Sequence, residues 1–144
     1  MNPEPAFHIP EDRYYDREHN IWAQTCDNGR IRIGIDAFLL SSLGELAYVA
    51  LFDVGTAAIR GDSIGTLEAA KMTTSINAPI SGVITQTNAA VLSDPQLINR
   101  EPYVNGWLIE LDPTNWDHES GLMVSGNDIP AWVQESTARL AETE

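Results

Sequence analysis

A series of short strand-like runs, each separated from the next by a turn signal, limits the folds open to this chain. In residues 31–35 every second residue is isoleucine, which is typical of a strand with one buried face. The Asp-Asn-Gly segment at 27–29 favours a hairpin, because Asn and Gly tolerate positive φ. This pattern predicts a mainly β domain, either a small sandwich or a barrel. Further runs of the same kind occupy 21–25, 45–52, 63–70, 73–78, 82–87 and 106–111.

Helical signals are confined to short segments and to the end of the chain. Asp36 is placed to cap a short helix that Gly44 ends. Apolar residues in 127–141 fall on one stripe, which predicts a C-terminal helix. Residues 1–19 are polar and contain three prolines, so we expect an N-terminal arm there, followed by a single domain at 20–144.

Composition excludes several classes of function. The 144 residues suit one domain, and we expect a monomer. With 21 acidic against 8 basic residues the net charge is −13, so nucleic acids and anionic membranes would repel the chain. No apolar run has membrane-spanning length and no signal-peptide pattern is present, which predicts a cytoplasmic protein. A single cysteine, Cys26, and three dispersed histidines predict neither an intramolecular disulfide nor a metal site.

Lys71 is the only lysine of the chain. The strand-like runs 63–70 and 73–78 flank it, so we expect Lys71 and Met72 at the tip of a hairpin. A solvated lysine, with neither burial nor a cationic neighbour to lower its pKa, is poorly suited to act as a base or nucleophile. It is better suited to be acylated by another enzyme. The alternative is a plain turn residue of an interaction domain.

The residues around Lys71 resemble the attachment site of lipoyl and biotinyl carrier domains. Glu68 precedes the lysine by three positions, and a Pro-x-Ser-Gly turn follows at 79–82. Biotin carriers have a methionine after their lysine, as Met72 is here, so this segment alone leaves a biotin carboxyl carrier as an alternative.

A second segment narrows the resemblance to one family. The sequence LINREPYVNGWLI at 97–109 is similar to the glycine cleavage H-protein family, and the similarity runs in order from about Trp22 to Leu140. This resemblance implies a sandwiched (hammerhead) β-barrel of the biotinyl/lipoyl carrier type, with short helices and a C-terminal helix. It also implies lipoic acid amide-linked to Lys71 by a lipoate-protein ligase, on a carrier that is not itself an enzyme.

The resemblance implies roles for further residues. Glu68 would be read by the ligase or would shape the hairpin, and Met72 lies beside the attachment point. His19 belongs to a segment that the family places near the cofactor, where it would face the lipoyl arm or hydrogen-bond within the domain. Cys26 is interpreted as a packed residue, with participation in sulfur transfer as the alternative.

Two departures from the family pattern bear on what the arm carries. H proteins have a Glu before the Trp of their first strand and an Asp four residues after the lysine, and these acids shelter a cationic aminomethyl group. Ile21 and Ser75 stand at those two positions here. The loss of both acids argues that the cargo is not an amine.

The departures favour a second branch of the family, the lipoate-binding proteins of sulfur oxidation, which the segment 17–22 also resembles. The partners that this branch implies are a heterodisulfide-reductase-like complex and dihydrolipoamide dehydrogenase. The alternative is a glycine cleavage H protein that carries an aminomethyl group, with glycine decarboxylase and aminomethyltransferase as partners.

Overall fold

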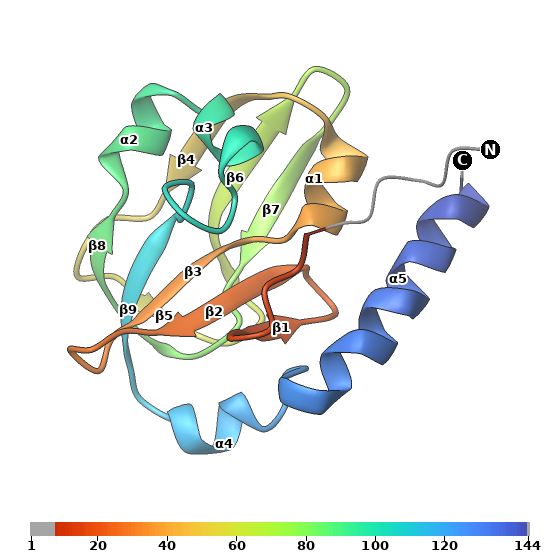
Figure 1. Cartoon of the computed structure of the whole chain (residues 1–144). Helices are drawn as coiled ribbons and strands as arrows, with labels where there is room; N and C mark the ends of the chain where they lie inside the picture. The colour runs from red at the N-terminus through yellow and green to blue at the C-terminus, as the bar shows by residue number, and fades with distance from the viewer. Residues whose placement is uncertain (1–7, 144) are drawn as a thin grey trace.

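The computed structural model describes residues 8–143, which form two antiparallel sheets around a common core (Figure 1). Residues 1–7 of the expected arm lie outside the described residues. The larger sheet has six strands in the order β1-β2-β3-β9-β8-β5, and the smaller has three in the order β4-β6-β7. In the larger sheet the strands are β1 (Tyr14–Asp16), β2 (Ile21–Thr25), β3 (Ile31–Ile35), β9 (Ile109–Pro113), β8 (Gly82–Thr87) and β5 (Ala57–Ala58). In the smaller sheet they are β4 (Leu46–Leu51), β6 (Ser63–Ala69) and β7 (Thr73–Asn77).

The expected mainly β class and sandwiched architecture are confirmed, and the barrel is not fully closed. No strand ladder in the described part of the chain joins the smaller sheet to the larger one. Strands β1 and β5 therefore end the larger sheet, and β4 and β7 end the smaller, whereas a closed barrel has no edge strands.

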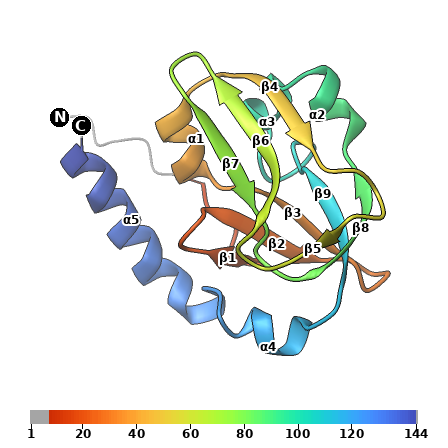
Figure 2. The same cartoon turned by 180° about the vertical axis from the view of Figure 1, so that it is seen from behind.

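Short helices connect the strands, and one long helix ends the chain. The helices are α1 (Ala37–Leu43), α2 (Ala89–Ser93), α3 (Gln96–Arg100), α4 (Trp116–Ser120), the 3-10 turn η1 (Gly126–Asp128) and α5 (Ile129–Thr143). The predicted C-terminal helix is thus present, with each end two residues later than in the predicted range 127–141. Both views place α5 alongside α1 and the β1–β2 end of the larger sheet (Figures 1 and 2). Among residues 8–143 no helix is long and apolar enough to cross a membrane.

Alternating strand residues from both sheets fill the core between them. Ile33 and Ile84 project from the larger sheet and Leu67 and Ile76 from the smaller, each at most 1% exposed. Full burial of such a side chain stabilises a fold by about 2 kcal/mol. This shared core holds the smaller sheet in place, although no hydrogen-bonded ladder between described strands connects the two sheets.

An aromatic cluster attaches helix α5 to the rest of the domain. The Trp132 ring lies 4.8 Å from the ring of Tyr15 in β1 and 5.3 Å from that of Phe38 in α1, measured between ring centroids. Trp22 of β2 belongs to the same cluster and is fully buried. Helix α5 is therefore packed against β1, β2 and α1 by large apolar rings.

Part of the expected N-terminal arm belongs to the larger sheet. Strand β1 pairs with β2, and Tyr15 exchanges two backbone hydrogen bonds of 2.8 Å with Val124. Tyr15 and Asp16 are both buried. Residues 14–16 thus close one edge of the sandwich.

Asp36 begins helix α1, as the sequence predicted. Its Oδ1 accepts a hydrogen bond of 2.9 Å from the backbone N–H of Leu39, and its Oδ2 accepts one of 3.1 Å from the Asn20 side chain. Gly44 follows the last helical residue with φ 76°, a conformation that favours glycine. Asp36 is completely buried, and this burial raises its pKa to about 7.

Gly65 lets strand β6 lie close to strand β4. It pairs with Leu51, and a Cβ atom at this position would overlap the carbonyl oxygen of Ala50. The smaller sheet, which carries the hairpin with Lys71, therefore depends on a residue without a side chain at this position.

We predict that Gly65→Ala lowers the free energy of unfolding by about 1–3 kcal/mol, because either β4 or β6 must move to admit the methyl group. Denaturant unfolding measures this difference. Gly121→Ala is the matched control: its Cβ would meet nothing nearer than the His118 carbonyl oxygen at 3.4 Å, so its stability should stay close to that of the wild type. Equal stability of the two variants would contradict the close approach.

We predict that Asp36→Asn changes how stability depends on pH. Burial raises the pKa of this carboxyl from its ordinary value of 3.8 to about 7, so between these values the folded state binds more protons than the unfolded state. Ionisation of Asp36 therefore lowers the free energy of unfolding as the pH rises from about 4 to 7. Asparagine keeps the N-cap acceptor and cannot ionise.

Thermal unfolding at a series of pH values tests this second prediction. The stability of Asp36→Asn relative to the wild type should increase between about pH 4 and pH 7 and then level off. A stability difference that does not vary over this range would show that the buried carboxyl does not titrate within it.

Candidate functional site

Lys71 lies in the two-residue loop at the tip of the β6–β7 hairpin, as predicted, but its neighbour in the loop is Ala70 rather than the predicted Met72. The loop consists of Ala70 and Lys71, and it is closed by a hydrogen bond of 2.9 Å from the Ala69 backbone N–H to the Met72 carbonyl oxygen. Figures 1 and 2 both show this hairpin at one end of the domain. Backbone pairing of β6 with β4 and β7 thus holds the loop outside the core.

The side chain of Lys71 is accessible to another protein. It is exposed, and within residues 8–143 its ammonium group makes no ion pair. A primary amine in this position is open to an enzyme that forms an amide on it. The residues present therefore fit a group amide-linked to lysine.

The residues beside Lys71 shape the surface of the hairpin without holding the lysine. Glu68 is exposed on β6, and Met72 is 46% exposed just after the lysine. Ser75 is exposed on β7, where it pairs with Thr66. The structure thus brings Glu68, Met72 and Ser75 to the same hairpin as Lys71.

Ile21 lies in the core rather than on a surface open to a ligand. It is 1% exposed, belongs to the cluster of buried aliphatic residues, and pairs with Ile35 of β3. The residues that follow it, Trp22 and Ala23, are buried as well, so β2 is covered on both faces. An acidic side chain at position 21 would have to be buried in this environment.

His19 lies in the turn between β1 and β2 and is held by Asp16. Its Nδ1 is 3.1 Å from the Asp16 Oδ2, and the other oxygen of this carboxylate accepts a hydrogen bond of 3.2 Å from the Glu18 backbone N–H. Asp16 is buried, whereas the His19 side chain is 33% exposed. The sequence left two alternatives for His19, facing the lipoyl arm or hydrogen-bonding within the domain. The structure shows His19 hydrogen-bonded within the domain, to Asp16.

Cys26 lies far from the lysine and is not activated. It follows β2 in the β2–β3 hairpin, and both views show that hairpin at the end of the domain opposite the β6–β7 hairpin (Figures 1 and 2). Burial is the main cause that raises the pKa of its thiol, and the neighbouring Glu110 adds to it. A thiol of this kind is a poor nucleophile, which favours the packed interpretation.

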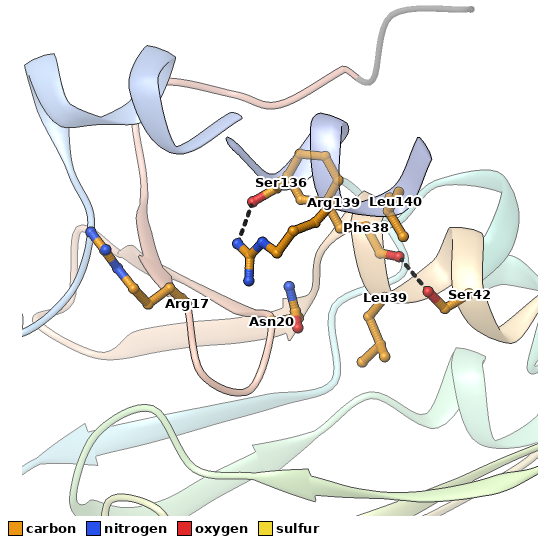
Figure 3. Close-up of a pocket in the computed structure, with 8 residues that line it drawn as sticks. All are labelled: Arg17, Asn20, Phe38, Leu39, Ser42, Ser136, Arg139 and Leu140. Carbon is orange, nitrogen blue, oxygen red and sulfur yellow. Dashed lines mark hydrogen bonds between the residues drawn. The ribbon is translucent and has the colours of Figure 1, made fainter. Parts of the chain in front are cut away.

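A pocket of about 250 Å³ lies between α1, α5 and the β1–β2 turn (Figure 3). Its charged lining residues are Arg17 of the turn and Arg139 of α5, and its other residues are polar or apolar. The lining consists of Arg17, Asn20, Phe38, Leu39, Ser42, Ser136, Arg139 and Leu140. Sequence reasoning missed this pocket, because three segments far apart along the chain form it.

Helix α1 links the pocket to the hairpin that carries Lys71, although no described residue of that hairpin lines the pocket. Helix α1 ends at Leu43, and Leu46, the first residue of β4, pairs with Ala69 just before the hairpin loop. Ser42, near the end of α1, lines the pocket. Figures 1 and 2 both show α1 between the hairpin and α5.

The described residues contain no metal-binding group of three or more His, Cys, Asp or Glu side chains. Asp16 and His19 form a hydrogen-bonded pair in the β1–β2 turn. The exposed lysine amine is accessible to an enzyme that would acylate it.

The sequence matches a known family over most of its length. The family model described as glycine cleavage H-protein matches residues 13–136. The probable glycine cleavage system H protein of Thermococcus kodakarensis is 37% identical over 113 residues, which cover 78% of this chain and 83% of the relative. The glycine cleavage system H protein of Carboxydothermus hydrogenoformans is 35% identical over 127 residues, covering 88% and 95% respectively.

A solved structure agrees with the sequence matches. The crystal structure of a glycine cleavage system H protein from Mycobacterium marinum superposes with a TM-score of 0.70 at 36% sequence identity. The match covers 74% of this chain and 87% of the solved chain. Sequence and fold therefore lead to the same assignment: this chain belongs to the glycine cleavage H-protein family, whose members are non-catalytic carriers of a lipoyl group on a lysine.

Proposed function

We propose that Lys71 carries the lipoyl group and that the β6–β7 hairpin presents it to partner enzymes. One observation carries this proposal: the only lysine of the chain lies exposed in a two-residue hairpin loop. Members of the family carry their cofactor on a lysine, and Lys71 is the only lysine of this chain, so it is the only candidate for the attachment site. The amide would remove the positive charge of Lys71 and extend its side chain into a long, flexible arm.

The protein's part in this function is to tether and present the arm. When bound, the lipoyl group supplies a disulfide that opens and closes by thiol–disulfide exchange. The hairpin loop fixes one end of the arm, so the other end samples a small volume at high effective concentration. A rigid sheet beneath the loop keeps the attachment point in one place for every partner.

Glu68 is suited to be recognised by the lipoate-protein ligase. Its side chain is exposed, and backbone pairing with Tyr48 and Thr73 already defines the strand around it. Since the hairpin does not need the carboxylate for its shape, recognition by the ligase is the better of the two roles that the sequence left open.

We predict that the native protein carries one lipoyl adduct and that Lys71→Arg carries none, because arginine keeps the positive charge but cannot form the amide. Intact-mass measurement after co-expression with a lipoate-protein ligase tests this. Glu68→Gln should fold normally and be lipoylated more slowly. An unmodified wild-type chain, or a biotin adduct in its place, would refute the proposal.

The names of the relatives favour one pathway. Those of Thermococcus kodakarensis and Carboxydothermus hydrogenoformans are described as glycine cleavage system H proteins. On this basis the second candidate function is transfer of an aminomethyl group, with glycine decarboxylase and aminomethyltransferase as partners.

The residues of the site favour a different cargo. Neither Ile21 nor Ser75 offers a negative charge to a cationic amine, and Ile21 is part of the core. The pocket between α1, α5 and the β1–β2 turn is lined by two arginines and, among the described residues, by no acidic one. These residues disfavour a cationic cargo, and we propose a sulfur cargo because residues 17–22 resemble the sulfur-oxidation branch of the family. The partners would then be a heterodisulfide-reductase-like complex and dihydrolipoamide dehydrogenase.

Loading with glycine separates the two candidates. We predict that the lipoylated protein, incubated with glycine and glycine decarboxylase, gains little aminomethyl adduct, because no acid at positions 21 or 75 balances the amine charge. The lipoylated relative from Thermococcus kodakarensis is the positive control. Mass spectrometry measures the loaded fraction, and loading as efficient as that of the control would assign this chain to glycine cleavage.

A gain-of-function variant makes this test sharper. Ser75→Asp places an acid on an exposed position of the hairpin and should increase aminomethyl loading without a change in stability. Ile21→Glu is less suitable as a partner variant, because Ile21 is 1% exposed here and a carboxylate at this position would cost stability.

A further inference from the structure

We propose that Asn28, in the β2–β3 hairpin, is a site of spontaneous deamidation, and that the fold protects Asn105 from the same reaction. Each of these residues precedes a glycine, and they form the two Asn-Gly pairs of the chain. Deamidation requires the backbone nitrogen of the following residue to reach the side-chain carbonyl carbon, and a glycine leaves that approach free of a side chain. The inference does not depend on the carrier function.

The reaction needs no reactant other than water. The lone pair of the Gly29 backbone nitrogen forms a bond to Cγ of Asn28, this nitrogen loses its proton, and the side-chain amine takes up a proton and leaves as ammonia. Water then adds to either carbonyl of the resulting cyclic imide and breaks the bond from that carbonyl to the Gly29 nitrogen. The product at position 28 is an aspartate or an isoaspartate, and nothing is oxidised or reduced.

The peptide unit between Asn28 and Gly29 is lightly held. The Gly29 N–H donates a hydrogen bond of 3.0 Å to the Cys26 carbonyl oxygen, whereas the Asn28 carbonyl oxygen accepts none from residues 8–143. Asn28 is exposed, and a Cβ atom built on Gly29 would have no neighbour within 4 Å. Few contacts therefore oppose rotation of this unit at the tip of the hairpin.

A backbone donor in the same turn is placed to assist the reaction. The Arg30 N–H donates a hydrogen bond of 3.0 Å to Oδ1 of Asn28. When the Gly29 nitrogen attacks Cγ, negative charge develops on this oxygen, and a donor that is already directed at it stabilises that charge. Adjacent residues of the hairpin thus supply both the nucleophile and the donor.

The peptide unit between Asn105 and Gly106 is held at both ends. The Asn105 carbonyl oxygen accepts a hydrogen bond of 2.8 Å from the Asn88 side chain, and the Gly106 N–H donates one of 2.8 Å to the Glu101 carbonyl oxygen. The Asn105 side-chain amide also donates one of 2.6 Å to the Glu101 carboxylate. Gly106 is buried, and a Cβ atom there would lie 2.6 Å from the Glu101 carbonyl oxygen. This unit cannot rotate without local unfolding.

The modification would change the hairpin and leave the lysine loop intact. An aspartate adds a negative charge beside Asp27, and an isoaspartate adds a methylene group to the backbone of a turn that the Cys26 N–H closes with a hydrogen bond of 2.8 Å to Arg30. The β2–β3 hairpin lies at the end of the domain opposite the β6–β7 hairpin (Figures 1 and 2). We therefore expect modified and unmodified chains to be lipoylated at the same rate.

Prolonged incubation of the full chain in mildly alkaline, heavy-oxygen water tests the proposal. The heavy oxygen enters each new acid, and peptide mapping by mass spectrometry measures it separately at positions 28 and 105. In the folded protein we expect position 28 to react at least about tenfold faster than position 105, because the second site must first unfold locally. Asn28→Gln is the matched variant: its amide closes a larger, less favourable ring, so it should lose the label at position 28 alone.

The same incubation in concentrated guanidinium chloride removes the fold. The two sites should then react at rates within about threefold of each other, because each is an Asn-Gly pair in an open chain. Equal rates at the two sites of the folded protein, or a position 28 that reacts only in the denaturant, would overturn the proposal. A Lys71 that is never lipoylated would refute the carrier function and leave the comparison of these two rates unchanged.

Discussion

Backbone pairing within the three-stranded sheet β4-β6-β7 is the constraint on which the rest of the site depends. It fixes the two-residue loop that presents Lys71, and through Leu46 and Ala69 it brings helix α1 beside that loop. The close approach of β6 to β4 at Gly65 makes this pairing sensitive to one methyl group. A flexible arm needs a rigid base if its free end is to find the same partner sites repeatedly, and the sheet supplies that base.

Features that are encoded locally were predictable from the sequence. The Asp-Asn-Gly turn at 27–29, the cap at Asp36 and the loop at Lys71 each depend on a few adjacent residues, and the structure contains all three. Features that depend on distant contacts were not predictable. Whether the sheets close into a barrel is decided by edge pairing between strands far apart in the chain. The pocket between α1, α5 and the β1–β2 turn has the same origin, because residues 17–20, 38–42 and 136–140 meet only after α5 packs through Trp132.

Ile21 shows how the structure changes the meaning of a sequence difference. From the sequence alone, Ile21 stands where H proteins have an acidic residue that faces the cargo. In the structure it is a core residue in a strand buried on both faces, so its apolar character also contributes to stability. The difference at Ser75 is of another kind, because that residue is exposed and its identity is not dictated by packing. The inference about cargo therefore depends more on Ser75 than on Ile21.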